Sequence, residues 1–339
     1  MVRTERSGRE RRRHRLRLAL HAAAVGLVVV FVYRERHVFQ GFASTLGRVQ
    51  WPWVVAAVAA ELASIPPLAE ANRVVLRIGG AKPPRWRVIL VILASNAISM
   101  SAPAGVAIAE GYAYTKFRRF GARKAVAAWV ELAVGAIAFS VLAAIGLAGA
   151  VVADGRAEAI LVAAISVLFV GSAVVALLFR HPPKLVRVVG WMERHVGRRL
   201  GGLLERASKR ARDMAQALKD VHPSIRAWAL VAGLSLVNWL MDVVCLGLSF
   251  QAVRVPVPWG AVLLAFAGGK AISSLGITPG GLGLVEGGLV ATFVAYGTKS
   301  SSAVAAVLVY RAITFVGLVG AGWAVAAVLA AETHQAREG

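Results

Sequence analysis

The sequence is poor in cysteine, in charged residues and above all in acidic residues. It has 339 residues and a single cysteine, Cys245, so an intramolecular disulfide is impossible and a disulfide-rich secreted module is excluded. Charged residues make up only 17%, against about 25% in ordinary soluble domains. This excludes a disordered chain and argues against a soluble protein. The seven histidines are scattered without metal-ligand spacing, so we expect neither a metal nor another cofactor.

Long apolar runs take the place of the missing charges. Hydrophobic residues make up 58%, and mean hydropathy is +0.66. A helix needs about 20 apolar residues to cross a bilayer. Six runs reach or nearly reach this length, namely 18–33, 52–72, 125–150, 159–179, 227–250 and 303–329, and two more, 88–115 and 260–296, are broken by proline and glycine. We predict an all-α polytopic membrane protein with about six full spans and two broken re-entrant or short helical hairpins.

Basic residues outnumber acidic ones by 39 to 17, and their distribution predicts the orientation. If the chain starts in the cytoplasm and alternates sides, 31 Lys and Arg lie in cytoplasmic segments and six in external ones. This bias follows the positive-inside rule, so both termini are expected in the cytoplasm of a multi-pass protein. Because these residues lie between apolar runs, nucleic acid is not an expected partner.

The same pattern predicts the domain organisation. Residues 1–17 form a basic cytoplasmic N-terminus, 18–332 a single membrane domain and 333–339 a cytoplasmic tail. Within the membrane domain, apolar residues recur at helical spacing among Arg and Lys over 181–222. This indicates one or two basic amphipathic helices on the cytoplasmic surface. The alternative is that they only pack against the loops.

The two broken stretches resemble each other. Both flanks of the first are basic, so it is expected to enter and leave on the cytoplasmic side, whereas the second begins and ends outside. A shift of 176 residues aligns Pro103 with Pro279, Gly105 with Gly281, Glu110 with Glu286, and Gly121 with Gly297. We interpret 88–121 and 260–297 as an inverted repeat of the transporter type, with a site near the bilayer centre. The alternative is a chance similarity between two Gly/Pro loops.

A new helix is expected after Pro103 and another after Pro279-Gly280-Gly281. Helix starts leave unpaired backbone N–H groups at a positive dipole end. In a membrane a lipid phosphate is a natural partner, and glycine allows its close approach. The alternative is that Gly283 only permits tight helix packing.

Charged residues within the apolar runs are the remaining candidates, because a charge at the bilayer centre costs about 2.5–3.5 kcal/mol. Arg311 is expected to pair with Glu110 or Glu286, or to hold a lipid phosphate. Glu61 and Asp242 lie outside the repeat and are expected to form structural pairs. We predict no catalytic residue, and the substrate-binding or translocation residues are Asn96, Pro103, Gly105, Glu110, Lys270, Pro279, Gly280, Gly281, Gly283, Glu286 and Arg311.

Three segments carry a family resemblance: SNAISMSAPAGVAIAEGYAY, ITPGGLGLVEGGL and VLVYRAITF. They resemble the lysylphosphatidylglycerol synthase transmembrane family, the flippase-like membrane domain of the multiple peptide resistance factor. The resemblance covers residues 50–330 and implies a bacterial inner-membrane protein that handles phospholipids such as aminoacylated phosphatidylglycerol. By motif match it carries over Pro279, Gly280, Gly281, Gly283, Glu286 and Arg311.

The full resistance factor adds a domain that transfers the aminoacyl group from tRNA, and this chain ends about ten residues after its last span. We therefore expect a protein that translocates or handles an anionic or aminoacylated phospholipid, rather than an enzyme. The alternative is a membrane-embedded transferase or accessory protein acting on a lipid or polyprenyl phosphate, although the four aspartates form no Asp-x-Asp pair. The expected partners are a membrane phospholipid and a separate lipid-modifying enzyme on the cytoplasmic face.

The charge pattern predicts that reporter fusions after Lys82 and after Arg119 report the same, cytoplasmic side. The reason is that each position lies in a cluster of five basic residues. Paired alkaline phosphatase and green fluorescent protein fusions measure this directly. Opposite sides at the two positions would remove the first hairpin and its relation to the second.

Overall fold

The computed structural model describes residues 49–154, 221 and 223–338, and the chain divides into a unit of residues 1–49 and a unit of residues 50–339. All regular structure among the described residues is helical, which confirms the predicted all-α class. The expected spans 18–33 and 159–179, the N-terminus 1–17 and nearly all of the amphipathic segment 181–222 lie outside the described residues.

Long apolar helices form where four of the uninterrupted runs were predicted. They are α3 (Trp51–Ile78), α6 (Lys124–Asp154), α10 (Ile225–Ala252) and a continuous segment of α13 (Ser300–Arg311), the π-helical turn η2 (Ala312–Gly317) and α14 (Leu318–Glu338). In the part of the chain that the structure describes, these four are long and apolar enough to span a membrane. The last helix continues through most of the predicted tail, 333–339.

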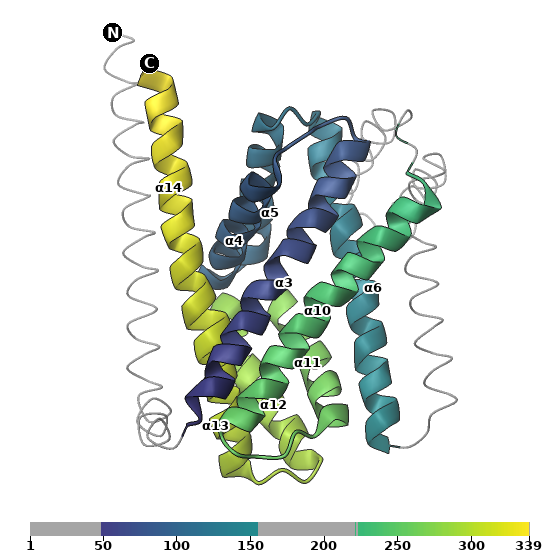
Figure 1. Cartoon of the computed structure of the whole chain (residues 1–339), viewed down its shortest axis with the longest axis vertical. Helices are drawn as coiled ribbons and strands as arrows, with labels where there is room; N and C mark the ends of the chain where they lie inside the picture. The colour runs from purple at the N-terminus through teal and green to yellow at the C-terminus, as the bar shows by residue number, and fades with distance from the viewer. Residues whose placement is uncertain (1–48, 155–220, 222, 339) are drawn as a thin grey trace, which may run out of the picture. The chain divides into compact units, whose positions relative to one another are not determined.

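The two broken stretches form hairpins of short helices. The first contains α4 (Arg85–Ser101) and α5 (Gly105–Arg119); the second contains α11 (Trp259–Ser274), a short 3-10 turn η1 (Pro279–Gly281) and α12 (Leu284–Ala295). At about 1.5 Å per residue, none of these helices reaches the ~30 Å needed to cross the hydrocarbon core. Figure 1 shows the two hairpins in opposite halves of the second unit. These bounds show that a helix starts after each of the two prolines, as predicted.

The backbone repeats itself at the spacing found in the sequence. Ala104 has φ 54° and ψ 21°, and Gly280, 176 residues later, has φ 56° and ψ 20°. The helix ends repeat as well: Gly121 has φ 87° and Gly297, again 176 residues later, has φ 86°. A left-handed alanine is uncommon, so its match to a glycine at the same spacing goes beyond shared composition.

Helices from the two halves of the unit pack against each other. α3 packs along α10, α6 along α11, and α14 along α4. Glycines lie at two of these contacts: a Cβ added at Gly149 would be 2.5 Å from the backbone nitrogen of Leu264, and one at Gly322 would be 2.5 Å from the backbone oxygen of Leu93. Small residues of this kind let helices in a membrane approach closely.

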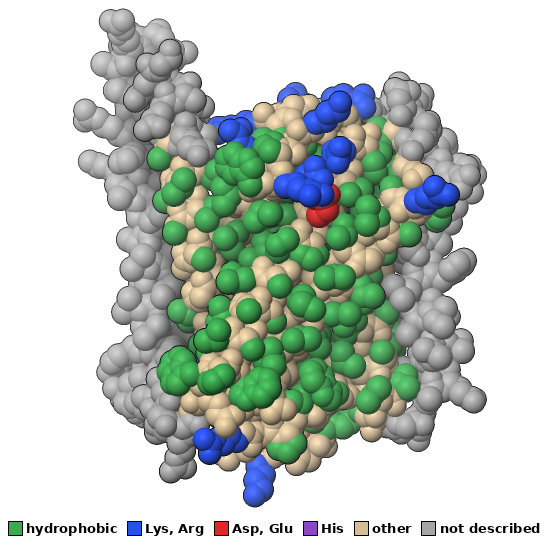
Figure 2. Space-filling view, viewed as in Figure 1, with side chains coloured by type: hydrophobic (Ala, Val, Ile, Leu, Met, Phe, Trp, Pro, Cys, Tyr) green, Lys and Arg blue, Asp and Glu red, His purple; other side chains and the backbone are tan. Residues whose placement is uncertain are grey.

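The surface of the unit is apolar and part of the interior is polar. Val55, Leu62 and Val316 are more than half exposed, whereas Glu61 and Asp242 are buried. Figure 2 shows hydrophobic side chains over most of this face, with Lys and Arg gathered toward the end where α3 leads into α4. An apolar surface around a partly polar interior is typical of a protein exposed to lipid and not of one exposed to water. The protein is an integral membrane protein.

We expect Gly149→Leu and Gly322→Leu each to destabilise the protein by about 1–3 kcal/mol, the usual cost of overpacking. The added side chain must push α6 from α11, or α14 from α4. Thermal unfolding of the purified protein in detergent measures this. Gly233→Leu is the matched control, because a Cβ there meets nothing within 4 Å. Equal melting temperatures for all three variants would contradict the packing.

Candidate functional site

The breaks of the two hairpins meet. The backbone N–H of Ala104, in the first break, donates to the backbone oxygen of Gly276, in the second, at 3.0 Å. A Cβ added at Gly280 would be 3.3 Å from the backbone oxygen of Met100 and closer still to the ring of Phe315. Two segments far apart in sequence thus meet at the points where the chain reverses direction. Position 280 requires glycine, both because its φ is positive and because its neighbours leave no room for a Cβ.

A cavity of about 160 Å³ opens beside this junction. Its lining comes from α4, α5, α6, α10, α11, α12, α13 and η2, and therefore from both hairpins. It is lined by Ser99, Met100, Val106, Phe139, Trp239, Phe266, Gly269, Lys270, Ser273, Ser274, Val285, Leu289, Tyr310, Arg311 and Thr314. The cavity wall is thus mainly apolar with a few serine and threonine hydroxyls and two cations, a pattern typical of ligand sites.

Arg311 connects the cavity to the second break. Its Nε donates to Oε1 of Glu286 at 2.5 Å, and its Nη2 donates to the backbone oxygen of Gly280 at 2.9 Å. The other carboxylate oxygen, Oε2, accepts from the backbone N–H of Gly283 at 2.6 Å. Of the two partners predicted for Arg311, the structure therefore gives Glu286. The start of α12, expected to be open to a ligand, is capped by this glutamate.

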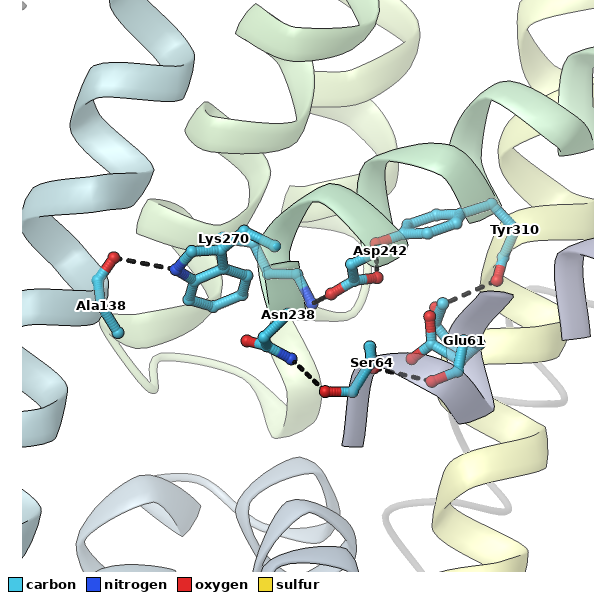
Figure 3. A network of polar contacts seen from close by, with 9 residues as sticks. Glu61, Ser64, Ala138, Asn238, Asp242, Lys270 and Tyr310 are labelled. Carbon is cyan, nitrogen blue, oxygen red and sulfur yellow. Dashed lines mark hydrogen bonds and ion pairs between the residues drawn. The ribbon is translucent and has the colours of Figure 1, made fainter. Parts of the chain in front are cut away.

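Lys270 belongs to a second polar network (Figure 3). Its Nζ is 2.6 Å from Oδ2 of Asp242, and it lies 5.4 Å from the ring centres of both Trp239 and Phe266. Tyr310 donates its hydroxyl to Oδ1 of the same aspartate at 3.2 Å. Lys270 is therefore an anchored cation, held by one carboxylate and two aromatic faces, whose side chain is still 22% exposed.

Not every predicted site residue lies at the cavity. Asn96 and Glu110 do not line it, and Pro103 and Glu110 are exposed on the surface of the first hairpin. The electrostatic neighbour of Glu110 is Glu131 on α6 rather than Arg311. Gly105, Gly280 and Gly281 are buried at the junction, where they shape the breaks. Whether any of these residues binds a lipid stays a prediction.

Glu61 and Asp242 were expected to form structural pairs, and the structure places both next to the site. Asp242 holds Lys270, which lines the cavity. Glu61 is buried, and its Oε2 has no hydrogen-bond partner among the described residues. The only sequence signal for either residue was a charge within an apolar run, because neither has a counterpart in the repeat.

A comparison with known families settles the relationship of the chain. Residues 18–322 match the family described as the lysylphosphatidylglycerol synthase TM region. The chain belongs to this family. The match covers the two broken hairpins and all the residues that line the cavity, and it confirms the resemblance found in the sequence motifs.

One curated relative is a UPF0104 membrane protein of Methanothermobacter thermautotrophicus. The two are 25% identical over 173 residues, which is 46% of this chain. The aligned part is about half the length of that relative, 51%. The lysylphosphatidylglycerol synthase transmembrane family is therefore established for this chain, and the activity has to be argued from its own site.

We expect Glu286 and Arg311 to be energetically coupled. A double-mutant cycle with Glu286→Gln and Arg311→Met in detergent should give an interaction energy of about 0.5–3 kcal/mol, because each single change leaves a partly buried charge without its partner. Unfolding of all four proteins measures it. The same cycle with Glu110→Gln and Arg311→Met is the control and should be additive within about 0.5 kcal/mol. Additivity in the first cycle would contradict the ion pair.

Proposed function

We propose that this protein moves an anionic or aminoacylated phospholipid between the leaflets of the membrane, with the lipid phosphate held in the cavity beside the two breaks. The observation that carries the proposal is that this cavity is lined by two cations, Lys270 and Arg311. Cations in the interior of a membrane protein are costly, and they commonly mark the path of a charged substrate.

The arrangement of the helices supports an inverted duplication of four elements rather than of the hairpins alone. The order long, short, short, long describes α3 to α6, and it describes again α10, α11, α12 and the continuous segment that begins with α13. α3 and α10 each have 28 residues, and the left-handed residues Ala104 and Gly280 recur at the shift found in the sequence. In such a protein the substrate site lies between the copies, and rocking one copy against the other exposes it to each side in turn.

The cavity suits a phosphate in size and chemistry. About 160 Å³ corresponds to roughly five water molecules at ~30 Å³ each. That volume accommodates a headgroup phosphate, while the acyl chains stay among the surrounding lipids. Arg311 has five N–H donors in a planar fork, and Glu286 takes only the one on Nε. The hydroxyls of Ser99 and Ser273 line the same space and complete a set of phosphate-binding groups.

The proposal includes an orientation. The basic end of the described surface faces the cytoplasm of a bacterial inner membrane, so that both termini are cytoplasmic. Support comes from the distribution of Lys and Arg, which gather toward one end of the view in Figure 2. A separate lipid-modifying enzyme on that side would supply an aminoacylated substrate.

Purified protein in vesicles should increase the rate at which a fluorescent phosphatidylglycerol crosses from one leaflet to the other. Arg311→Ala and Glu286→Gln should abolish this increase, because the proposed phosphate site loses its cation or the carboxylate that positions it. Ser99→Leu should reduce it at least tenfold by filling the cavity without changing a charge. Dithionite quenching of the outer leaflet measures all four proteins.

Glu70→Gln is the matched control for these variants. Glu70 forms a comparable ion pair, with Arg73 at 2.6 Å, but away from the cavity, so its loss should leave the rate unchanged. A cooperative melting transition and an unchanged chromatographic profile show that a variant is folded. Wild-type rates in folded Arg311→Ala and Ser99→Leu would refute the site. A mass change in the lipid, instead of movement, would favour a transferase.

A further inference from the structure

The network behind Lys270 contains a carboxylate that the proposed phosphate site does not use. Glu61 lies on α3 and is 3% exposed, and in the part of the chain that the structure describes its buried Oε2 has no hydrogen-bond partner. Its side chain lies close to those of Asp242 and Cys245 on α10. Figure 3 places it beside Asp242, on the side away from Lys270. Two acidic groups therefore share this space with one cation.

The contacts of Asp242 show which of the two carries a proton. Its Oδ2 accepts from Lys270 and its Oδ1 from the hydroxyl of Tyr310. A cation and a hydroxyl thus stabilise negative charge on Asp242, whereas Oε2 of Glu61 has no such partner among the described residues. Two neighbouring buried carboxyl groups lose their protons one after the other, because their charges repel strongly in a low dielectric, so the second ionises only at higher pH. The proton of the pair is therefore on Glu61.

We propose that Glu61 is a proton-binding site whose occupancy allows Lys270 to leave Asp242 and to bind an anionic group in the cavity. The inference rests on the proposed function and adds a regulation to it. When Glu61 is protonated, its O–H can donate to Asp242, and Tyr310 donates to the other oxygen, so the aspartate stays satisfied without the lysine. When Glu61 is ionised, two negative charges hold Lys270 in place.

The groups that act on Glu61 come from three neighbouring helices: Asp242 and Cys245 from α10, Lys270 from α11 and Tyr310 from α13. Among the described elements, α3 also packs against α4, α6 and η2. In α4 the charged residues are Arg85 and Arg87 at its start, in α6 they are Lys124, Glu131 and Asp154, and η2 has none. Protonation of Glu61 therefore acts on the cavity through the charges of Asp242 and Lys270.

The coupling has a definite sign. Binding of an anion to Lys270 requires the proton, so by linkage the protein takes up protons when the anion binds at a pH at which Glu61 is ionised. Anion affinity is then highest at low pH. It falls about tenfold per pH unit once Glu61 is ionised in the free protein.

Calorimetric titration of the purified full chain with a short-chain phosphatidylglycerol, across pH and in buffers of different ionisation enthalpy, measures affinity and proton uptake together. The wild type should lose affinity with rising pH and take up protons. Glu61→Gln should bind with the low-pH affinity at every pH and take up none, because the amide donates to Asp242 as the protonated acid does. Glu70→Gln, the control on the same helix, should behave as the wild type does.

The outcomes separate this inference from the proposed function. Binding by the wild type without proton uptake at any pH overturns the inference and leaves the phosphate site standing, even if Glu61→Gln fails to fold. If folded Glu61→Gln shows the same pH dependence of anion affinity as the wild type, the inference is likewise overturned and the phosphate site still stands. Choline serves as the replacement cation in a test for sodium. If the affinity depends on the sodium concentration rather than on pH, the ion bound at Glu61 is not a proton. No binding by the wild type at any pH overturns the function and the inference together.

Discussion

The structure depends on one constraint: a charge or a free backbone N–H within the lipid has to find its partner inside the protein. Two ion pairs meet this constraint at the centre of the described unit, Lys270 with Asp242 at 2.6 Å and Arg311 with Glu286 at 2.5 Å. The first links α10 to α11 and the second links α12 to α13. A broken hairpin in lipid is tolerated only where its exposed backbone groups are satisfied, and Glu286 does this for the start of α12.

The apolar runs and the breaks could be predicted from sequence because they depend on local properties. Run length gave the four described spanning helices, and Pro103 and Pro279, each closely followed by glycine, placed the two breaks. Proline alone is a weaker signal, because Pro66 and Pro67 lie inside α3. The π-helical turn of Ala312–Gly317 had no such signal. Its sequence is compatible with an ordinary helix, and the extra residue in the turn is set by packing.

The site could be predicted only in part because its partners are far apart in sequence. Arg311 was assigned to a glutamate, but the alignment could not choose between Glu110 and Glu286. The structure gives the reason for the choice: Glu286 is the third residue of its helix and reaches back to Gly283, whereas Glu110 is the sixth residue of α5 and is exposed. The short turn η1 delays the start of the second helix, so equal spacing in sequence does not give equal positions. No sequence motif indicated that Asp242 pairs with Lys270.

The π-helical turn directly after Arg311 has a mechanical consequence. α13 packs against α12 of the second hairpin, while α14 packs against α4 of the first, so one continuous helix is fastened at its two ends to different hairpins. The turn between them holds an additional residue and is a weak point in the helical ladder. Torsion between the two hairpins would concentrate there, directly after Arg311 and at Thr314, and would therefore act on residues that line the cavity.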